Sequence, residues 1–243
     1  MKSAPSKSEN DYIISLLKFN SRLLELVNEK NEAIKKLAEV TVAAMTSIIG
    51  TRDEETKGHM QRTGEYVLAI ANELKNSGLY LTELSEENIF TLKKSAPLHD
   101  IGKVGIDDSI LKKSGKFTPE EFEVMKNHTI IGSEALKKAK AVMGEPSFLD
   151  CAEILARHHH EKWDGSGYPD RLKNTEIPLF ARIMAIADVY DALVSKRSYK
   201  EAIPHDETVA IMKDCNGTQF DPDICSAFLR INEDFYYISK KFT

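Results

Sequence analysis

The sequence has no apolar run long enough to cross a membrane. Of its 243 residues, 42% are apolar, yet no stretch reaches the about 18–20 consecutive apolar residues that a membrane-spanning helix requires. The first residues are polar and lead into a charged helical pattern, without the apolar segment and small-residue cleavage site of a secretory signal. These absences predict a protein that neither enters a membrane nor is secreted.

Cysteine, glycine and proline are also scarce. The three cysteines, Cys151, Cys215 and Cys225, are odd in number and lack C-x-x-C spacing, which argues against a disulfide framework or a thiolate zinc site and fits a reducing cytoplasm. With 12 Gly and 8 Pro, the chain is not a disordered or loop-rich one. No basic run is long and the net charge is -5, so we expect no polymeric nucleic acid as partner.

Alternating apolar and polar strands are missing as well, which predicts an all-α fold. Thr118-Pro119-Glu120-Glu121 is a strong helix start, with Thr118 as the cap. Ser85, followed three residues later by Asn88, is another helix start. Helices are expected over 56–75, 85–98, 118–128, 151–160, 179–195 and 206–214, with a last one opened at 221–223. We expect an N-terminal helical extension, 1–49, and a catalytic domain, 50–243.

The extension has a heptad pattern. Apolar residues recur at alternate steps of three and four from Ile13 to Ile48, interrupted by Asn20, Lys30 and Thr41. One interpretation is a dimerising coiled coil in which Asn20 determines the register. The other is an amphipathic helix packed on its own domain, because Lys30 and Thr41 weaken the seam. The pattern does not decide between a homodimer stalk and an intramolecular helix.

Histidine is the residue that stands out. Of the seven histidines, all but His205 fall between positions 59 and 160. His99-Asp100 and His159-His160 are adjacent pairs, and Asp188 lies in an apolar helix where an unpaired carboxylate would be costly. The candidate metal ligands, in chain order, are Glu55, His59, His99, Asp100, His128, His159, His160 and Asp188.

The chemistry of this set is imidazole plus carboxylate, without thiolate. Such ligands suit first-row divalent metals, including iron, manganese and zinc. Eight candidates exceed what one six-coordinate ion needs, which favours two or three ions. Two ions about 3.5–4 Å apart can acidify a bridging water and hold the attacking and leaving oxygens of a phosphodiester.

Two motifs resemble a known family. LHDIGKVGI (98–106) resembles the HD superfamily of metal-dependent phosphohydrolases, and HHHEKWDGSGYP (158–169) resembles its HD-GYP subfamily. The surrounding segments at 52–62, 127–132, 186–200 and 216–222 agree with the pattern. The resemblance covers about residues 50–230, in order and without a large gap.

The resemblance implies an all-α HD-domain bundle and a bacterial cytoplasmic phosphodiesterase. Such enzymes linearise cyclic di-GMP to pGpG with a metal-bridging hydroxide, and some continue to GMP. Other family members cleave cyclic GMP-AMP, and degenerate members are weak receptors rather than enzymes. All three alternatives stay open here, with cyclic di-GMP hydrolysis as the main hypothesis.

The resemblance also implies residue roles. The eight candidates above would be the metal ligands, with Asp100 as the bridge, Glu55 at a third ion, and iron or manganese as the metals. Lys103 would contact the scissile phosphate. Arg197 and Lys200 would bind phosphate and guanine, and Tyr168 would contact substrate or shape the pocket.

Several neighbours have expected supporting roles. Asp191 is expected to stabilise its helix or support a ligand, and Arg62 to be an ion-pair partner. Glu161 either orients a ligand histidine or caps or pairs at the surface. His158 and His205 are expected to lie outside the ligand set. Gly102 is expected to let the loop after Asp100 turn sharply.

Overall fold

The computed structural model describes residues 7–52, 58–143, 148–196 and 201–242. These residues form helices and no strand, apart from one isolated bridge between Asn216 and Phe220, so the all-α prediction is confirmed. Among the helices in these ranges, none combines the length and apolarity needed to cross a bilayer. The chain forms two units, Met1–Ala44 and Met45–Thr243.

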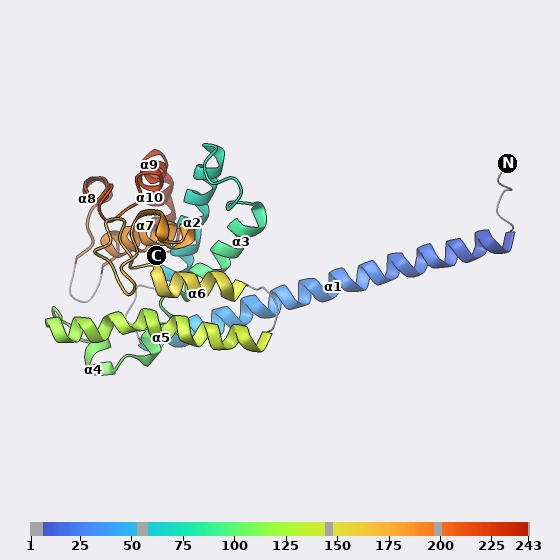
Figure 1. Ribbon diagram of the computed structural model, residues 1–243, viewed down its shortest axis with the longest axis horizontal. Coiled ribbons are helices and arrows are strands. Elements are labelled where there is room, and N and C mark those ends of the chain that lie inside the picture. The colour runs from blue at the N-terminus through green and yellow to red at the C-terminus, as the bar shows by residue number, and fades with distance from the viewer. Residues whose placement is uncertain (1–6, 53–57, 144–147, 197–200, 243) are drawn as a thin grey trace. The chain divides into compact units, whose positions relative to one another are not determined.

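The described part of the N-terminal unit is a single helix, which continues past Ala44 into the first residues of the larger unit. Helix α1 (Lys7–Arg52) is continuous over 46 residues and passes through the domain boundary expected at residue 49 (Figure 1). Most of its described apolar side chains are exposed, including Leu16, Leu23 and Leu37, whereas Val42 is partly buried. The predicted helix is therefore present, and the heptad positions from Ile13 to Ala44 that the structure describes are exposed in this chain.

The larger unit begins with helices α2 (His59–Asn76), α3 (Glu86–Ser95), α4 (Asp108–Leu111) and α5 (Pro119–Met143). Two short 3₁₀ turns, η1 (Ala96–Leu98) and η2 (Ile101–Gly105), lie between α3 and α4. The predicted starts are confirmed: the Ser85 hydroxyl accepts a hydrogen bond from the Asn88 N–H, and the Thr118 hydroxyl accepts one from the Glu121 N–H.

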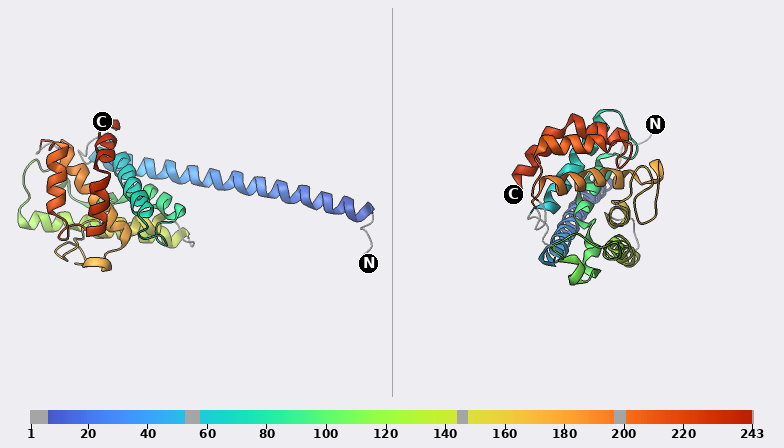
Figure 2. Two further views of the ribbon diagram at one scale, coloured as in Figure 1. Left: turned by 90° about the horizontal axis from the view of Figure 1, so that it is seen from above. Right: turned by 90° about the vertical axis from the view of Figure 1, so that its left-hand side faces the viewer.

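The second half contains α6 (Phe148–His158), the short turn η3 (Asn174–Glu176), α7 (Leu179–Val194), α8 (His205–Asp214), α9 (Pro222–Arg230) and α10 (Asn232–Lys241). Helix α2 is central, with α3, α7, α9 and α10 packed against it, and α5 packs beside α6 (Figures 1 and 2). This arrangement encloses the first turn of α2.

Three expected boundaries were wrong. His128 does not end its helix, because the apolar pattern continues through Ile130 and Leu136 and no proline lies between His128 and Met143. His159 and His160 lie just beyond α6, where the Glu161 N–H bonds to the His158 carbonyl and turns the chain. The last expected helix is two helices, because Ile231 adopts φ -115 and ψ 20 between them.

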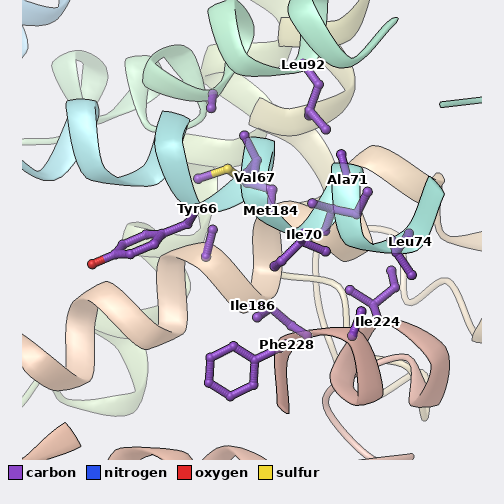
Figure 3. Close-up of a cluster of buried hydrophobic side chains, with 14 of the residues drawn as sticks. Tyr66, Val67, Ile70, Ala71, Leu74, Leu92, Met184, Ile186, Ile224 and Phe228 are labelled. Atoms are coloured by element: carbon purple, nitrogen blue, oxygen red, sulfur yellow. The ribbon is translucent and has the colours of Figure 1, made fainter. Parts of the chain in front are cut away.

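The core lies between α2 and its neighbours. Tyr66, Ile70 and Leu74 of α2 are fully buried against Met184 of α7 and Phe228 of α9 (Figure 3). Burying each large apolar side chain contributes about 1.5–3 kcal/mol. The core thus fixes α2 against α7, and with them the positions of His59 on α2 and of Asp188 and Asp191 on α7.

A close backbone contact joins η2 to α5. A Cβ on Gly102 would lie 1.9 Å from the His128 carbonyl oxygen and 2.5 Å from the Gly132 nitrogen. Gly102 is therefore needed for close packing rather than for a sharp turn. Only glycine lets the loop after Asp100 approach the turn of α5 that contains His128.

Gly102→Ala is expected to destabilise the protein by about 1–3 kcal/mol, because η2 and α5 must separate to admit the methyl group. Urea unfolding followed by circular dichroism measures this effect. Gly115→Ala is the matched control, since nothing lies within 4 Å of a Cβ there. Equal stability of Gly102→Ala and the unmodified protein would refute the close-contact interpretation.

Candidate metal centre

Five segments of the larger unit bring polar side chains to one place. His59 is the first residue of α2, Asp100 separates η1 from η2, and Asp188 lies on α7. His128 comes from the middle of α5, and His159 follows α6. His59, His99, Asp100, His128 and His159 are each at most 7% exposed. The sequence-predicted ligands that the structure describes therefore converge in a buried cluster.

Asp100 is at the centre of the cluster. Its Oδ2 lies 3.2 Å from His99 Nε2, and its Oδ1 lies 3.2 Å from His128 Nε2 and 3.6 Å from His159 Nε2. The two oxygens of one carboxylate thus face two different groups of histidines. This geometry suits a carboxylate that bridges two metal ions.

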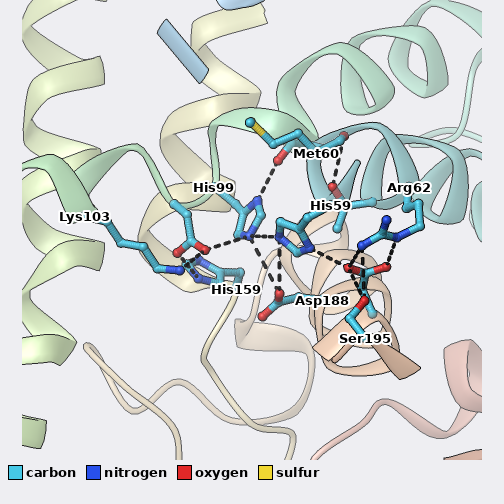
Figure 4. A network of polar contacts seen from close by, with 12 residues as sticks. His59, Met60, Arg62, His99, Lys103, His159, Asp188 and Ser195 are labelled. Atoms are coloured by element: carbon cyan, nitrogen blue, oxygen red, sulfur yellow. Dashed lines mark hydrogen bonds and ion pairs between the residues drawn. The ribbon is translucent and has the colours of Figure 1, made fainter. Parts of the chain in front are cut away.

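The first group lies between α2 and α7. His59 Nε2 is 3.5 Å from His99 Nε2, and Asp188 Oδ1 is 3.9 Å from the former and 3.8 Å from the latter nitrogen. Figure 4 shows these side chains pointing toward one another. The second group contains His128, His159 and His160 with Asp100.

Hydrogen bonds at Nδ1 orient the rings. His99, His128 and His159 each contact a backbone carbonyl oxygen through Nδ1, at Ala96 (2.8 Å), Met125 (2.7 Å) and Leu155 (2.8 Å) respectively. A carbonyl can only accept, so each Nδ1 donates its proton. The neutral rings then present Nε2 lone pairs to the cluster, which is the form that binds metals.

These lone pairs need a cation. Burial lowers the pKa of His159 and His160, so their rings stay neutral. His128 Nε2 and His159 Nε2 face each other at 3.5 Å, and Asp100 Oδ1 is buried without a hydrogen-bond donor among the described residues. Facing acceptors and an undonated carboxylate oxygen are costly in a buried site, and divalent metal ions fit this donor set.

Asp100 is ionised in this environment. Burial raises the pKa of its carboxyl group, but the charge of the Lys103 ammonium outweighs burial and holds that pKa well below its usual value. The Lys103 Nζ lies 2.8 Å from Asp100 Oδ2. Lys103 therefore lies at the centre, as its position after Asp100 predicts.

Asp191 supports His59 from behind. Its carboxylate accepts from His59 Nδ1 at 2.7 Å and from Arg62 Nε at 2.6 Å. Burial raises the pKa of Asp191, but these two partners lower it to about 2. The expected supporting roles of Asp191 and Arg62 are confirmed, and Arg62 also donates to the hydroxyl of Ser195, the residue after α7.

The loop after α6 carries Tyr168 to the cluster. The Tyr168 ring lies 4.8 Å from the His160 ring, and burial raises the pKa of its phenol, which stays protonated. A Cβ on Gly167 would lie 2.3 Å from the Lys162 nitrogen, so glycine allows this loop to fold back on itself. Tyr168 thus borders the second histidine group.

Glu161 differs from both expected roles. It is buried, and its carboxylate accepts hydrogen bonds from the backbone N–H groups of Asp170 at 2.7 Å and Leu172 at 3.1 Å. It therefore holds the Tyr168 loop rather than a histidine ring or a surface partner. This role of Glu161 could not be predicted from the sequence, because its partners are backbone N–H groups, which every residue other than proline has.

Other expected residues divide into two sets. His158 contacts Asp170 at 3.1 Å, and His205 contacts the Tyr190 hydroxyl at 2.8 Å, so both lie outside the cluster as expected. Glu55, Arg197 and Lys200 fall outside the described residues.

The three carbonyl oxygens that orient the histidines were missed, although their spacing of three or four residues before each histidine follows from helical geometry.

Comparison with known proteins identifies a family. The model of the HD domain matches residues 25–224 of the chain. A crystal structure described as a cyclic GMP-AMP specific phosphodiesterase of V. cholerae superposes with a TM-score of 0.58 at 20% identity, covering 85% of this chain and 53% of that one. This likeness supports the all-α HD bundle.

Two curated relatives from Vibrio cholerae show closer sequence similarity. A cyclic di-GMP phosphodiesterase is 45% identical over 96% of this chain and 47% of its own length. A 3'3'-cGAMP-specific phosphodiesterase is 36% identical over 88% of this chain and 38% of its own length. The chain spans about half the length, or less, of the curated relatives it matches.

Asp100→Ala is expected to abolish metal binding, because it removes the only carboxylate that faces both histidine groups in the described site. Elemental analysis of protein purified anaerobically and loaded with iron or manganese measures bound metal. Circular dichroism verifies that the variant is folded. Asp170→Asn is the control carboxylate and should retain metal; full occupancy in folded Asp100→Ala would contradict the bridging role.

Proposed function

Because this chain belongs to the HD-GYP family of the HD superfamily, we propose that it hydrolyses cyclic di-GMP to linear pGpG, with GMP as a further product. The observation that carries this proposal is the placement of the Asp100 carboxylate, whose two oxygens face separate histidine groups. Such a centre has the donors for the metal-dependent cleavage of a phosphodiester.

The proposed cofactors are two or three ions of iron or manganese. His59, His99 and Asp188 with Asp100 would hold one, and His128, His159 and His160 with Asp100 another. Glu55 would serve a third. When bound, such ions acidify water and neutralise phosphate charge. The histidines contribute by presenting fixed, neutral Nε2 atoms, and Asp191 keeps the His59 ring in place.

The cations of the chain receive the substrate's negative charge. Lys103, 15% exposed at its side chain, is proposed to contact the scissile phosphate and stabilise charge that develops on its oxygens. Arg197 and Lys200 are proposed to bind the other phosphate and a guanine edge, by a forked contact and a point charge respectively. Tyr168, as a protonated phenol, would donate a hydrogen bond at the pocket edge.

The identity of relatives favours cyclic di-GMP over cyclic GMP-AMP. The relative named for the former is 45% identical, and the one named for the latter 36%. A receptor without turnover is the other alternative, but every ligand position that the family uses is present in this sequence. The three cysteines are free, which is in keeping with our proposal of a cytoplasmic enzyme.

For the N-terminal helix we propose a homodimer stalk over residues 1–49, joined to a catalytic domain over 50–243. The heptad side chains Leu23, Ile34 and Leu37 are 49%, 64% and 66% exposed. Apolar residues at this spacing are buried when a second, identical helix supplies the partner face. Asn20, at a seam position, would favour a parallel pair in register.

Dimerisation is expected to depend on this seam. Leu23→Glu with Leu37→Glu should halve the mass measured by analytical ultracentrifugation, from twice the chain mass of 27.3 kDa to that of a single chain. Ser21→Glu with Lys36→Glu, on the outer face of the same helix, is the matched control and should stay dimeric. A monomeric unmodified chain at micromolar concentration would refute the stalk.

The catalytic proposal is tested with anaerobically purified protein loaded with iron or manganese. Incubation with cyclic di-GMP should yield pGpG, separated by chromatography. Lys103→Ala should keep its metal but lose about 30- to 1,000-fold in kcat, because an oxyanion-stabilising cation contributes about 2–4 kcal/mol.

Lys112→Ala is the matched control, because Lys112, the exposed residue after α4, also pairs with an aspartate, Asp108, at 2.8 Å. It should leave kcat unchanged. Tight binding of cyclic di-GMP without any linear product, under every metal loading, would assign the receptor function instead. A higher kcat/KM for cyclic GMP-AMP than for cyclic di-GMP would change the substrate.

A further inference from the structure

A row of rings leads outward from the metal centre. The His160 ring lies 4.8 Å from the Tyr168 ring, at an interplanar angle of 34°. The Tyr168 ring lies 6.1 Å from the Phe122 ring, at 84°. His160 and Tyr168 are half-buried, whereas Phe122 is 42% exposed. The row therefore connects a candidate metal ligand to a solvent-facing aromatic surface.

A lysine accompanies the two outer rings. Lys126 lies one turn after Phe122 on α5 and two residues before His128. Its Nζ is 4.9 Å from the centre of the Phe122 ring and 5.5 Å from that of Tyr168, and it forms an ion pair with Glu123 at 2.6 Å. A positive charge thus lies beside the aromatic row, on the helix that supplies a histidine to the centre.

Core packing does not account for Phe122. It is absent from the cluster of buried side chains that α2, α7 and α9 form, and its ring contacts in the described part of the molecule are those with Tyr168 and Lys126. A single exposed phenylalanine is ordinary. Here the exposed ring extends the surface of the residue that borders the centre.

We propose that Phe122, with Tyr168 and Lys126, forms a purine-binding subsite beside the metal centre; this inference rests on the proposed function. A cyclic dinucleotide carries two purines, and one must lie outside the centre when its adjoining phosphate is inside. An aromatic ring offers that purine a stacking surface. The Lys126 ammonium offers a hydrogen-bond donor to a purine carbonyl oxygen.

The subsite gives Phe122 a role in specificity. Stacking acts on the base and not on the reacting phosphate, so loss of the ring weakens substrate binding more than it slows the chemical step. Phe122→Ala is expected to raise KM for cyclic di-GMP about 5- to 100-fold, the range of one base–aromatic stack. Phe122→Trp should restore a KM near that of the unmodified chain.

The experiment measures kcat and KM of the full, metal-loaded chain with two substrates: cyclic di-GMP and methyl p-nitrophenyl phosphate, a diester without purines. Phe122→Ala should lower the ratio of the two kcat/KM values about 5- to 100-fold. Phe90→Ala is the matched control, because Phe90 is 49% exposed and also has a lysine, Lys94, with its Nζ 4.3 Å from the ring centre. In Phe90→Ala, the ratio of kcat/KM for cyclic di-GMP to kcat/KM for methyl p-nitrophenyl phosphate should not change.

Two outcomes would overturn the subsite. If Phe122→Ala lowers kcat/KM equally for both substrates, the ring has a structural role. If it changes neither value while the unmodified chain cleaves cyclic di-GMP, the base binds elsewhere and only this inference fails. Absence of turnover by the unmodified chain, in contrast, overturns the proposed function and the subsite with it.

Discussion

The two oxygens of the Asp100 carboxylate face opposite sides of one buried cluster. The surrounding elements place histidines on both of these sides. His99 lies on the Oδ2 side, and His128 and His159 lie on the Oδ1 side. Each side draws on helices far apart in the sequence, α2 and α7 on one and α5 and α6 on the other. A carboxylate in this position can contribute one oxygen, and part of its negative charge, to each of the two histidine groups.

Burying so many polar groups costs free energy, and the fold offsets this cost in two ways. The apolar core between α2, α7 and α9 holds the His59 end of the cluster. Hydrogen bonds at Nδ1, to three backbone carbonyls and to Asp191, fix the ring orientations. The remaining cost comes from Nε2 lone pairs that face one another and from Asp100 Oδ1, which has no hydrogen-bond donor among the described residues. Bound cations would offset this cost by pairing with these atoms.

The sequence predicts the members of the centre better than their arrangement. Clustered histidines and the motif at 98–106 identify the ligands because the residue types themselves carry the chemistry. Their division into two groups depends on where Nε2 atoms from distant helices meet, which no local pattern encodes. Gly102 illustrates the difference: glycine suggests a turn, whereas the structure needs it for close contact with α5.

Helix starts are likewise more predictable than helix ends. Ser85 and Thr118 cap their helices through side-chain oxygens, a local effect. The break at Ile231 has no glycine or proline to mark it and follows from how α9 and α10 each pack against α2. Phe122 and Lys126 resemble any residues on the outer face of a helix, and their relation to Tyr168 depends on the loop that Glu161 holds.

The central claim is that Asp100 lies between two bound metal ions. Anomalous scattering from crystals of the manganese- or iron-loaded chain, measured at the absorption edge of the metal, tests it directly. At least two peaks are expected, two of them about 3.5–4 Å apart, with one on the His99 side and one on the His128 side of the carboxylate. A single peak, or peaks that share no ligand at Asp100, would contradict it.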